Sequence, residues 1–175
     1  NGGAGLNTAD YSGATSAVTA DLSKGTASGG SDVGTDTLSA IQNLSGGSAS
    51  DTLSGNSGNN VLNGGGGSDE LIGAAGNDTL NGAAGFDCAE YASASSNLSI
   101  TLGNGVTAGT ATGGSDVGTD ALISIEEACG GDGNDKITGR TDTASTLQGG
   151  GGNDSLVAGT TDASIADTLD GGGGN

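Results

Sequence analysis

Acidic and amide side chains recur at every ninth residue in the middle of the chain. The sixth place of five consecutive nine-residue units, which begin at Gly46, holds Asp51, Asn60, Asp69, Asp78 and Asp87. Oxygen-bearing side chains at a fixed interval are suited to binding hard cations. The sequence contains no His, which excludes Ser-His-Asp catalysis and most zinc chemistry. Cation binding is therefore the chemistry that this spacing favours.

An aliphatic residue follows each of these side chains two positions later. The eighth place of the same units holds Leu53, Leu62, Leu71, Leu80 and Ala89. One unit earlier, Gln42 and Leu44 occupy the two places. These residues predict a very short strand that points its aliphatic side chain inward. The Gly-rich remainder of each unit predicts a turn, because residues without a Cβ atom accept positive φ and expose their carbonyl oxygens.

The pattern is duplicated along the chain. NGGAGLNTADYSG from residue 1 parallels NGAAGFDCAEYAS from residue 81, and GGSDVGTDTLSAI from residue 29 parallels GGSDVGTDALISI from residue 113. We therefore expect two cassettes. The first, residues 1–80, has an insert at about 11–36 and opens an array of nines at about 37–90. The second, residues 81–175, has an insert at about 91–120 and an array at about 121–175, in which residues 139–148 and 158–170 form longer units.

Composition limits what else the chain can be. Its 175 residues include 39 Gly and no Pro, and only 31% are hydrophobic, which on composition alone predicts disorder. The formal net charge of −18 argues against binding nucleic acid or anionic membranes. No apolar run is long enough to span a bilayer, so membrane insertion is not expected. The final GGGGN stops one residue before the next Asp in the frame, and we expect a longer repetitive protein.

Three units carry a resemblance to a known family. GGGGSDELI, GGDGNDKIT and GGGGNDSLV resemble the nonapeptide GGxGxDxUx, where U is a large aliphatic residue, of repeats-in-toxin (RTX, hemolysin-type) proteins. The inserts are similar to those of large secreted RTX proteins and of serralysin-type C-terminal domains. The resemblance implies an all-β fold, a right-handed parallel β-roll (β-solenoid) with calcium in the turns and irregular β-rich inserts.

Elementary physics agrees with calcium as the ion. If two nines form one coil, coils stack at about 4.8 Å and align carboxylates that are eighteen residues apart. Asp51, Asp69 and Asp87 then share one edge, and Asn60 and Asp78 share the other. Such a column is strongly repulsive unless a cation lies in it. Calcium accepts six to eight oxygen ligands, whereas magnesium requires a tighter octahedron and zinc prefers His or thiolates.

The resemblance also implies a ligand set. Each ion takes the Asp and two carbonyls from one turn, and the same groups from the turn stacked on it. One expected site joins Gly64, Gly66 and Asp69 with Ala83, Gly85 and Asp87. A second joins Gly46, Ser48 and Asp51 with Gly65, Gly67 and Asp69. Further sites pair Asn60 with Ala74, Gly76 and Asp78, and Gly130, Asp132 and Asp135 with Gly150, Gly152 and Asp154. Asn60 offers a neutral oxygen, so its site is expected to be weaker.

Five acidic residues outside these sites leave alternatives open. Asp32, Asp36, Asp116 and Asp120, in the two GSDVGTD segments, are either additional calcium ligands or ordinary turn caps. Glu126 stands at the ligand position of the nine-residue frame, and the corresponding residue of cassette one is Gln42. That exchange favours an exposed strand residue.

Cys88 and Cys129 replace Thr8 and Ser45 of cassette one. Both cysteines flank an insert expected to leave the roll and return, which would bring them onto neighbouring coils. We expect a disulfide, with free buried thiols as the alternative. A catalytic Cys is not expected without a His to activate it.

The function expected is that of a calcium-binding structural module, not an enzyme, in a large secreted or cell-surface bacterial protein such as an adhesin, surface-layer or filament protein. The resemblance implies folding on calcium and type I secretion. The expected partners are several Ca2+ ions and further copies of the chain or neighbouring repeats. The alternative is a C-terminal, secretion-associated domain of an extracellular protease, lipase or epimerase.

Overall fold

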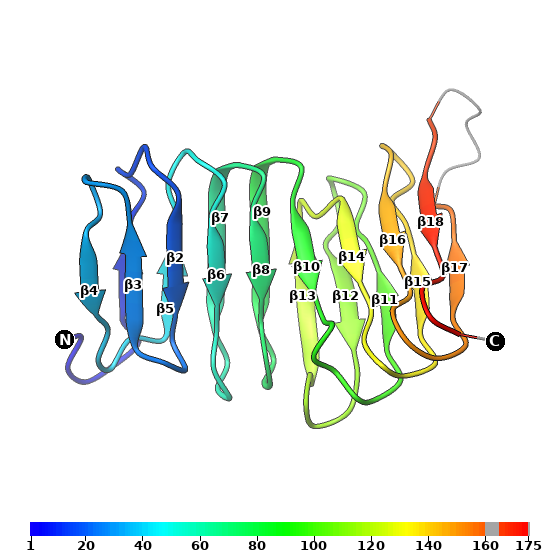
Figure 1. The fold of residues 1–175 in the computed structure, drawn as a ribbon, viewed down its shortest axis with the longest axis horizontal. Coiled ribbons are helices and arrows are strands. Elements are labelled where there is room, and N and C mark those ends of the chain that lie inside the picture. Colours follow the sequence, from blue (N-terminus) through cyan, green and yellow to red (C-terminus); the bar gives the residue numbers. More distant parts are fainter. Residues whose placement is uncertain (160–164, 175) are drawn as a thin grey trace.

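The computed structural model describes residues 1–159 and 165–174, so part of the thirteen-residue unit and residue 175 lie outside it. The described chain contains eighteen short strands and no helix, arranged in two nine-stranded sheets that face each other along an elongated body (Figure 1). No helix among the described residues has the length and apolar character needed to cross a membrane.

Most strands are three or four residues long. In spatial order, the first sheet consists of β1 (Thr8–Asp10), β5 (Asn43–Ser45), β7 (Val61–Gly67), β9 (Thr79–Gly85), β13 (Thr119–Ile123), β12 (Gly109–Thr112), β11 (Ser99–Thr101), β15 (Lys136–Thr138) and β17 (Ser155–Val157). The second consists of β18 (Thr168–Asp170), β16 (Thr146–Gln148), β14 (Glu127–Cys129), β10 (Cys88–Glu90), β8 (Glu70–Ile72), β6 (Thr52–Ser54), β2 (Val18–Asp21), β3 (Thr26–Gly29) and β4 (Thr35–Thr37).

Successive nonapeptides alternate between the two sheets, so that two units make one coil. Leu44, Leu62 and Leu80 are register partners in the parallel strands β5, β7 and β9 of one sheet. Leu53 and Leu71 are partners in β6 and β8 of the other. The register advances by eighteen residues per coil, which confirms the predicted parallel β-roll.

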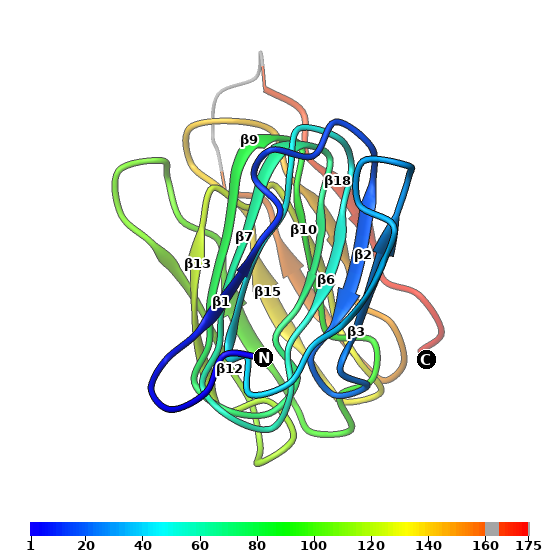
Figure 2. The same ribbon diagram turned by 90° about the vertical axis from the view of Figure 1, so that its left-hand side faces the viewer.

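The core is a thin ladder of aliphatic side chains between the two sheets. Figure 2 shows the ribbons of these sheets from one end of the roll. The five leucines at the eighth place, counted from Leu44 to Leu80, are at most 1% exposed. Full burial of one such side chain contributes about 1.5–3 kcal/mol. Their outward neighbours are polar except for Val61 and Ile72, neither of which is buried, so each strand buries little more than one residue, as the sequence pattern predicts.

Each insert forms three strands. In the second insert, β11 pairs in parallel with β15, β12 runs antiparallel to both of its neighbours, and β13 pairs in parallel with β9. In the first, β2 pairs in parallel with β6, and β3 and β4 follow as antiparallel strands. The inserts are β-rich, as predicted. They do not leave the roll, however, because their strands continue the two sheets through regular hydrogen-bonded ladders.

Candidate metal sites

The acidic residues of the repeats form a ladder along each edge of the roll. The backbone N–H of Asp51 donates to Oδ1 of Asp69 (2.8 Å), and the N–H of Asp69 donates to Oδ1 of Asp87 (2.8 Å). On the other edge, the N–H of Asn60 donates to Oδ1 of Asp78 (2.7 Å). We call a residue whose side-chain oxygen accepts such a bond a ladder residue. The predicted grouping of these side chains, eighteen residues apart, is therefore present.

The second carboxylate oxygen divides the ladder residues into two groups. Oδ2 of Asp51 accepts the N–H of Gly47 (2.6 Å), and Oδ2 of Asp135 accepts the N–H of Gly131 (3.0 Å). Among the described residues, nothing donates to the buried Oδ2 atoms of Asp69, Asp78, Asp87 and Asp154. A buried carboxylate oxygen without a donor is unfavourable by several kcal/mol unless a cation or water compensates it.

Turn conformation follows the same division. The second and fourth residues of four turns have positive φ, and these residues are Gly65, Gly67, Ala74, Gly76, Ala83, Gly85, Gly150 and Gly152. Those turns precede the four aspartates whose Oδ2 has no donor. The turns of Asp51 and Asp135 have no positive φ, and their second N–H points at the carboxylate. The predicted positive-φ turns are therefore confirmed for four units and wrong for three, because the turn of Asn60 has no positive φ either, and there the N–H of Asn56 donates to Oδ1 of Asn60 (2.8 Å).

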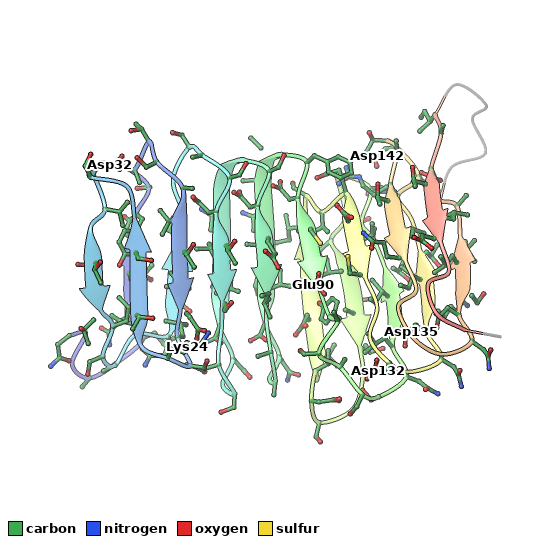
Figure 3. All side chains as sticks on the ribbon, viewed as in Figure 1. Lys24, Asp32, Glu90, Asp132, Asp135 and Asp142 are labelled. Carbon is green, nitrogen blue, oxygen red and sulfur yellow. The ribbon has the colours of Figure 1, made fainter. Side chains whose placement is uncertain are left out.

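The turns of Asp51 and Asp135 contact the inserts. The N–H of Ser48 donates to the carbonyl of Ala14 (3.0 Å), and the N–H of Asp132 donates to the carbonyl of Ala94 (2.9 Å). In both turns insert backbone therefore takes the place of the preceding coil. Asp132 and Asp135 are labelled at one edge of the roll in Figure 3.

A glycine at the first place of each unit makes room for the carboxylate. A Cβ atom at Gly64 or Gly149 would overlap Oδ2 of the Asp in its own turn, and one at Gly73 would come within 2.6 Å of Oδ2 of Asp78. The carboxylate thus folds back over its own turn. Only a residue without a side chain fits beneath it.

Burial makes the metal-free ladder electrostatically unfavourable. Burial raises the pKa of Asp69 to about 6, with a backbone hydrogen bond opposing the shift and the charges of Asp87 and Asp51 adding to it. Burial likewise raises the pKa of Asp78 to about 7. The pKa values of Asp87, Asp120 and Asp135 are also raised by burial. Such shifts are expected where carboxylates are stacked without a counter-ion.

The donor set fits a hard cation. The available atoms are carboxylate and carbonyl oxygens, and one turn stacks directly on the next where Gly65 pairs with Ala83 and Gly67 with Gly85. Asp69 and Asp87 both have an unpartnered Oδ2 at this position. By contrast, the Nδ2 group of Asn60 donates to the carbonyl of Gln42 (2.7 Å). Where an aspartate would offer a second carboxylate oxygen, Asn60 therefore offers a hydrogen-bond donor. The turns of Asp69 and Asp87 therefore make the best-formed candidate site.

Comparison with known families agrees with this geometry. A model of the RTX calcium-binding nonapeptide repeat, which covers four copies, matches residues 45–80, 54–87 and 130–162. The chain carries RTX calcium-binding repeats. A search of curated proteins gives no match. The chain is thus a calcium-binding β-roll module, and the repeat family is structural rather than catalytic.

The ladder extends beyond the RTX repeats that the sequence pattern identified. Oδ1 of Asp120, in the second insert, accepts the N–H of Asp78 (2.8 Å). Oδ1 of Asp167, in the thirteen-residue unit, accepts the N–H of Ser145 (2.7 Å). The sequence pattern placed neither residue at the sixth place of a nine-residue unit, although Asp120 was considered as an additional calcium ligand. Both stand two positions before an aliphatic residue, Leu122 or Leu169, and this signal would have found them.

The prediction that Glu126 is an exposed strand residue is wrong. It is partly buried, and its Oε2 accepts the N–H of Asp87 (3.1 Å), which makes it a ladder residue. Its Oε1 lies 2.8 Å from Nη1 of the buried Arg140. A guanidinium therefore supplies at Glu126 a positive charge that no other ladder carboxylate has among the described residues.

The GSDVGTD aspartates have two different roles. Oδ2 of Asp32 accepts the N–H of Thr15 (2.7 Å), and Oδ2 of Asp116 accepts the N–H of Ser95 (2.8 Å), so both are turn caps. Hydrogen bonds from Ser16 and Thr15 hold the pKa of Asp32 well below its usual range. Asp36 and Asp120 instead each accept a Tyr hydroxyl, from Tyr11 and Tyr91 respectively (both 3.0 Å).

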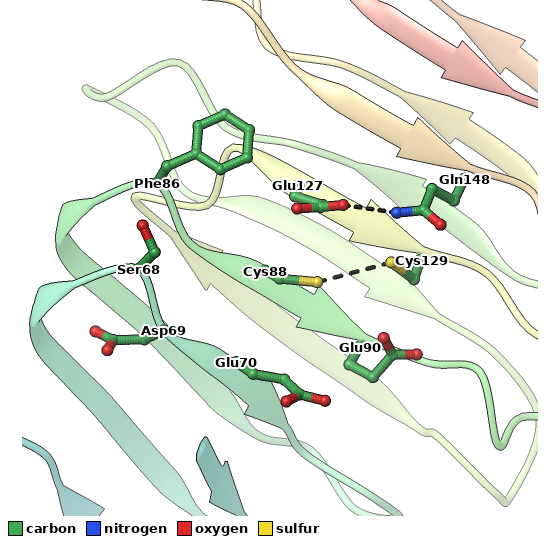
Figure 4. A pocket seen from close by; sticks show the side chains of 9 residues that line it. All are labelled: Ser68, Asp69, Glu70, Phe86, Cys88, Glu90, Glu127, Cys129 and Gln148. Atoms are coloured by element: carbon green, nitrogen blue, oxygen red, sulfur yellow. Dashed lines mark hydrogen bonds between the residues drawn. The ribbon is translucent and has the colours of Figure 1, made fainter. Parts of the chain in front are cut away.

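The two cysteines lie on the outer face of neighbouring strands. Cys88 of β10 and Cys129 of β14 have free thiols, with their Sγ atoms 3.7 Å apart (Figure 4). They line a shallow pocket with Phe86, Glu90 and Glu127. The neighbouring thiol and burial raise the pKa of Cys88 well above its usual range. The structure brings the pair together, and the disulfide stays a prediction.

Proposed function

We propose that this module is a structural part of a secreted or cell-surface bacterial protein, and that it folds completely only when calcium is bound. The observation that supports the proposal most strongly is the set of four buried carboxylate oxygens without donors in positive-φ turns. Calcium in those turns would supply the missing partner and neutralise the edges coil by coil. We assign the ions to the turn pairs expected from sequence, with the Asp69–Asp87 pair filled first.

The proposal explains how so poor a core can be stable. The hydrophobic ladder is one residue wide, while 39 glycines lose much backbone entropy on folding. Ligand binding to the folded state alone stabilises it by mass action. Roughly millimolar extracellular calcium suffices for sites of this class, whereas low intracellular calcium leaves the chain unfolded. This difference in calcium concentration would allow the chain to be exported unfolded and to fold outside the cell.

The test is a calcium titration of the metal-free, monomeric chain, followed by far-ultraviolet circular dichroism. We expect a coil-like spectrum that converts to a β-sheet spectrum as calcium is added and reverts with EDTA. Magnesium at the same concentration serves as the control and should have a much smaller effect. A full β-sheet spectrum in EDTA would overturn the coupling of folding to calcium.

A further inference from the structure

The outer face of the second sheet carries a cluster of side chains whose chemistry differs from that of the calcium turns. In the neighbouring parallel strands β10 and β14, Cys88 is the register partner of Glu127, and Glu90 is the partner of Cys129. The alanine between each of these pairs is fully buried, so all four side chains point to the solvent side of the sheet. They form a four-sided array with the two cysteines on one diagonal.

The sulfur atoms are spaced as in a tetrahedral metal site. Sγ of Cys88 and Sγ of Cys129 lie 3.7 Å apart, and Figure 4 shows the two thiols facing each other beside Glu127. Two zinc–sulfur bonds of about 2.3 Å at a tetrahedral angle would place the sulfur atoms about 3.8 Å apart. A carboxylate oxygen of Glu127 lies within 4.8 Å of both sulfur atoms. One divalent ion can therefore reach all three ligand atoms after small side-chain movements.

A hydrogen bond from the next strand orients the carboxylate. Nε2 of Gln148, in β16, donates to Oε1 of Glu127 (2.6 Å). Outer residues commonly hold metal-binding side chains in this way. Glu70, the partner of Cys88 on the other side, is engaged differently, because its Oε2 accepts the hydroxyl of Thr52 (3.4 Å). The ligand set is thus two thiols and one carboxylate, and the fourth position faces the shallow pocket and is open to water.

Cassette one has the same strand pairing without this ligand set. β1 and β5 pair in parallel in the same register as β10 and β14. The four corresponding positions hold Thr8, Asp10, Asn43 and Ser45. Two hydroxyls and an amide thus stand where the second cassette has its two thiols and the carboxylate of Glu127. All three ligand positions therefore differ together between the two cassettes.

We propose that Cys88, Cys129 and Glu127 bind one zinc ion on the outer face of the roll. Zinc accepts thiolate and carboxylate ligands in a tetrahedron, whereas calcium prefers oxygen atoms only. Binding releases the two thiol protons to solvent. The site goes beyond the calcium-dependent folding proposed above and depends on it only for a folded roll.

The ion joins the two strands between which the second insert lies. Cys88 and Cys129 are 41 positions apart, and the insert strands β11, β12 and β13 lie between them in the sequence. A link across this segment closes a long loop and so restricts the unfolded chain. Zinc binds the reduced thiols, so the ion and the disulfide expected from sequence are alternative states of the same pair.

The first test is a calorimetric titration of zinc into the reduced, calcium-saturated chain. Calcium occupies the turns, so we expect one tightly bound zinc per chain. The double variant Cys88→Thr, Cys129→Ser restores the residues of cassette one and should lose this binding. Gln148→Ala should weaken it by about tenfold. Glu70→Gln is the matched control, because it removes a carboxylate from the same face without touching the ligand set, and it should bind zinc like the parent.

The second test identifies the ligands with cobalt, which accepts the same ligands as zinc. We expect thiolate-to-cobalt charge-transfer absorption in the near ultraviolet for the parent and for Glu70→Gln, and none for the double variant. Circular dichroism in calcium shows separately whether each chain is folded. A folded, reduced parent that binds no zinc, that gives no charge-transfer band, or that binds zinc equally well without its cysteines would overturn the proposal.

Discussion

At the residue scale, the turn conformation decides whether the second carboxylate oxygen of a repeat aspartate accepts a protein N–H or has no donor. A second residue with negative φ turns its N–H onto the carboxylate, as in the turns of Asp51 and Asp135. A second residue with positive φ removes that donor. Ala74 and Ala83 adopt this left-handed conformation although they carry a Cβ atom (φ 67° and 70°), which is strained.

Ala83→Gly should therefore stabilise the roll. Glycine removes the backbone strain that Ala83 has in the left-handed conformation, and this gain exceeds the additional backbone entropy that glycine loses on folding. The free energy of unfolding should therefore rise by about 0.5–1 kcal/mol. Ala84→Gly is the control, since Ala84 does not have positive φ, and it should destabilise the roll slightly. Urea unfolding in saturating calcium measures both. A loss of stability in Ala83→Gly would contradict the strained turn.

The thiol pair gives a second prediction at this scale. Oxidation should join Cys88 to Cys129 within one chain, because their Sγ atoms are already 3.7 Å apart on adjacent strands. Mass spectrometry of a proteolytic digest should find the linked peptide. Cys129→Ser restores the residue that cassette one has at the same place, Ser45, and should fold normally without the link. If both thiols remain free after treatment with a mild oxidant, the prediction is wrong.

At the element scale, the repeating unit is a ladder residue followed two positions later by an inward aliphatic side chain. This pattern includes Gln42, Glu126 and Asp167 as well as the regular nonapeptides, since Leu44, Ala128 and Leu169 follow them. The side chain fixes the start of the strand by accepting an N–H from the preceding coil. The aliphatic residue then anchors the strand in the core.

Removal of one ladder carboxylate should have an effect that depends on its neighbours. Asp69 lies between Asp51 and Asp87 and was assigned to two ions, whereas Asp135 was assigned to one. Asp69→Ala should therefore lose more bound calcium than Asp135→Ala, by about one ion per chain. Isothermal titration calorimetry of the two variants and the parent provides the comparison. Equal losses would contradict the shared stacking.

The sequence was sufficient to predict the coil and most of the candidate site, because a strict period fixes register. Asp51, Asp69 and Asp87 were placed on one edge by the period alone. The inserts were predicted to be β-rich, but the positions and the antiparallel pairing of their strands were not, since no repeat reveals them. Glu126 was misjudged because a comparison of residue types does not show that Arg140, fourteen residues later, provides its counter-ion.

At the scale of the whole molecule, protons and calcium should compete for the same carboxylates. Burial raises the pKa of Asp69 to about 6 and of Asp78 to about 7, above the value of about 3.9 in an unfolded chain. The metal-free folded state therefore binds more protons than the unfolded state. Its stability should be greatest near pH 4 and should be lost as pH rises through 6 to 7.

The β-sheet content of the metal-free chain, followed by far-ultraviolet circular dichroism at pH 5 and pH 8, measures this effect as the folded fraction. The capped carboxylates with lowered pKa, such as Asp32, titrate below this window and do not interfere. Calcium affinity should show the opposite trend and fall as pH decreases below about 7, because protons displace the ion. Greater metal-free stability at pH 8 than at pH 5 would contradict the burial of uncompensated carboxylates.

The most direct test of the central claim is the anomalous diffraction of crystals grown in calcium. We predict a calcium peak between the turns 64–69 and 82–87, with Oδ atoms of Asp69 and Asp87 and backbone carbonyl oxygens at about 2.3–2.6 Å. Crystals that show no anomalous peak there, with protein N–H groups donating to both Oδ2 atoms instead, would contradict the account.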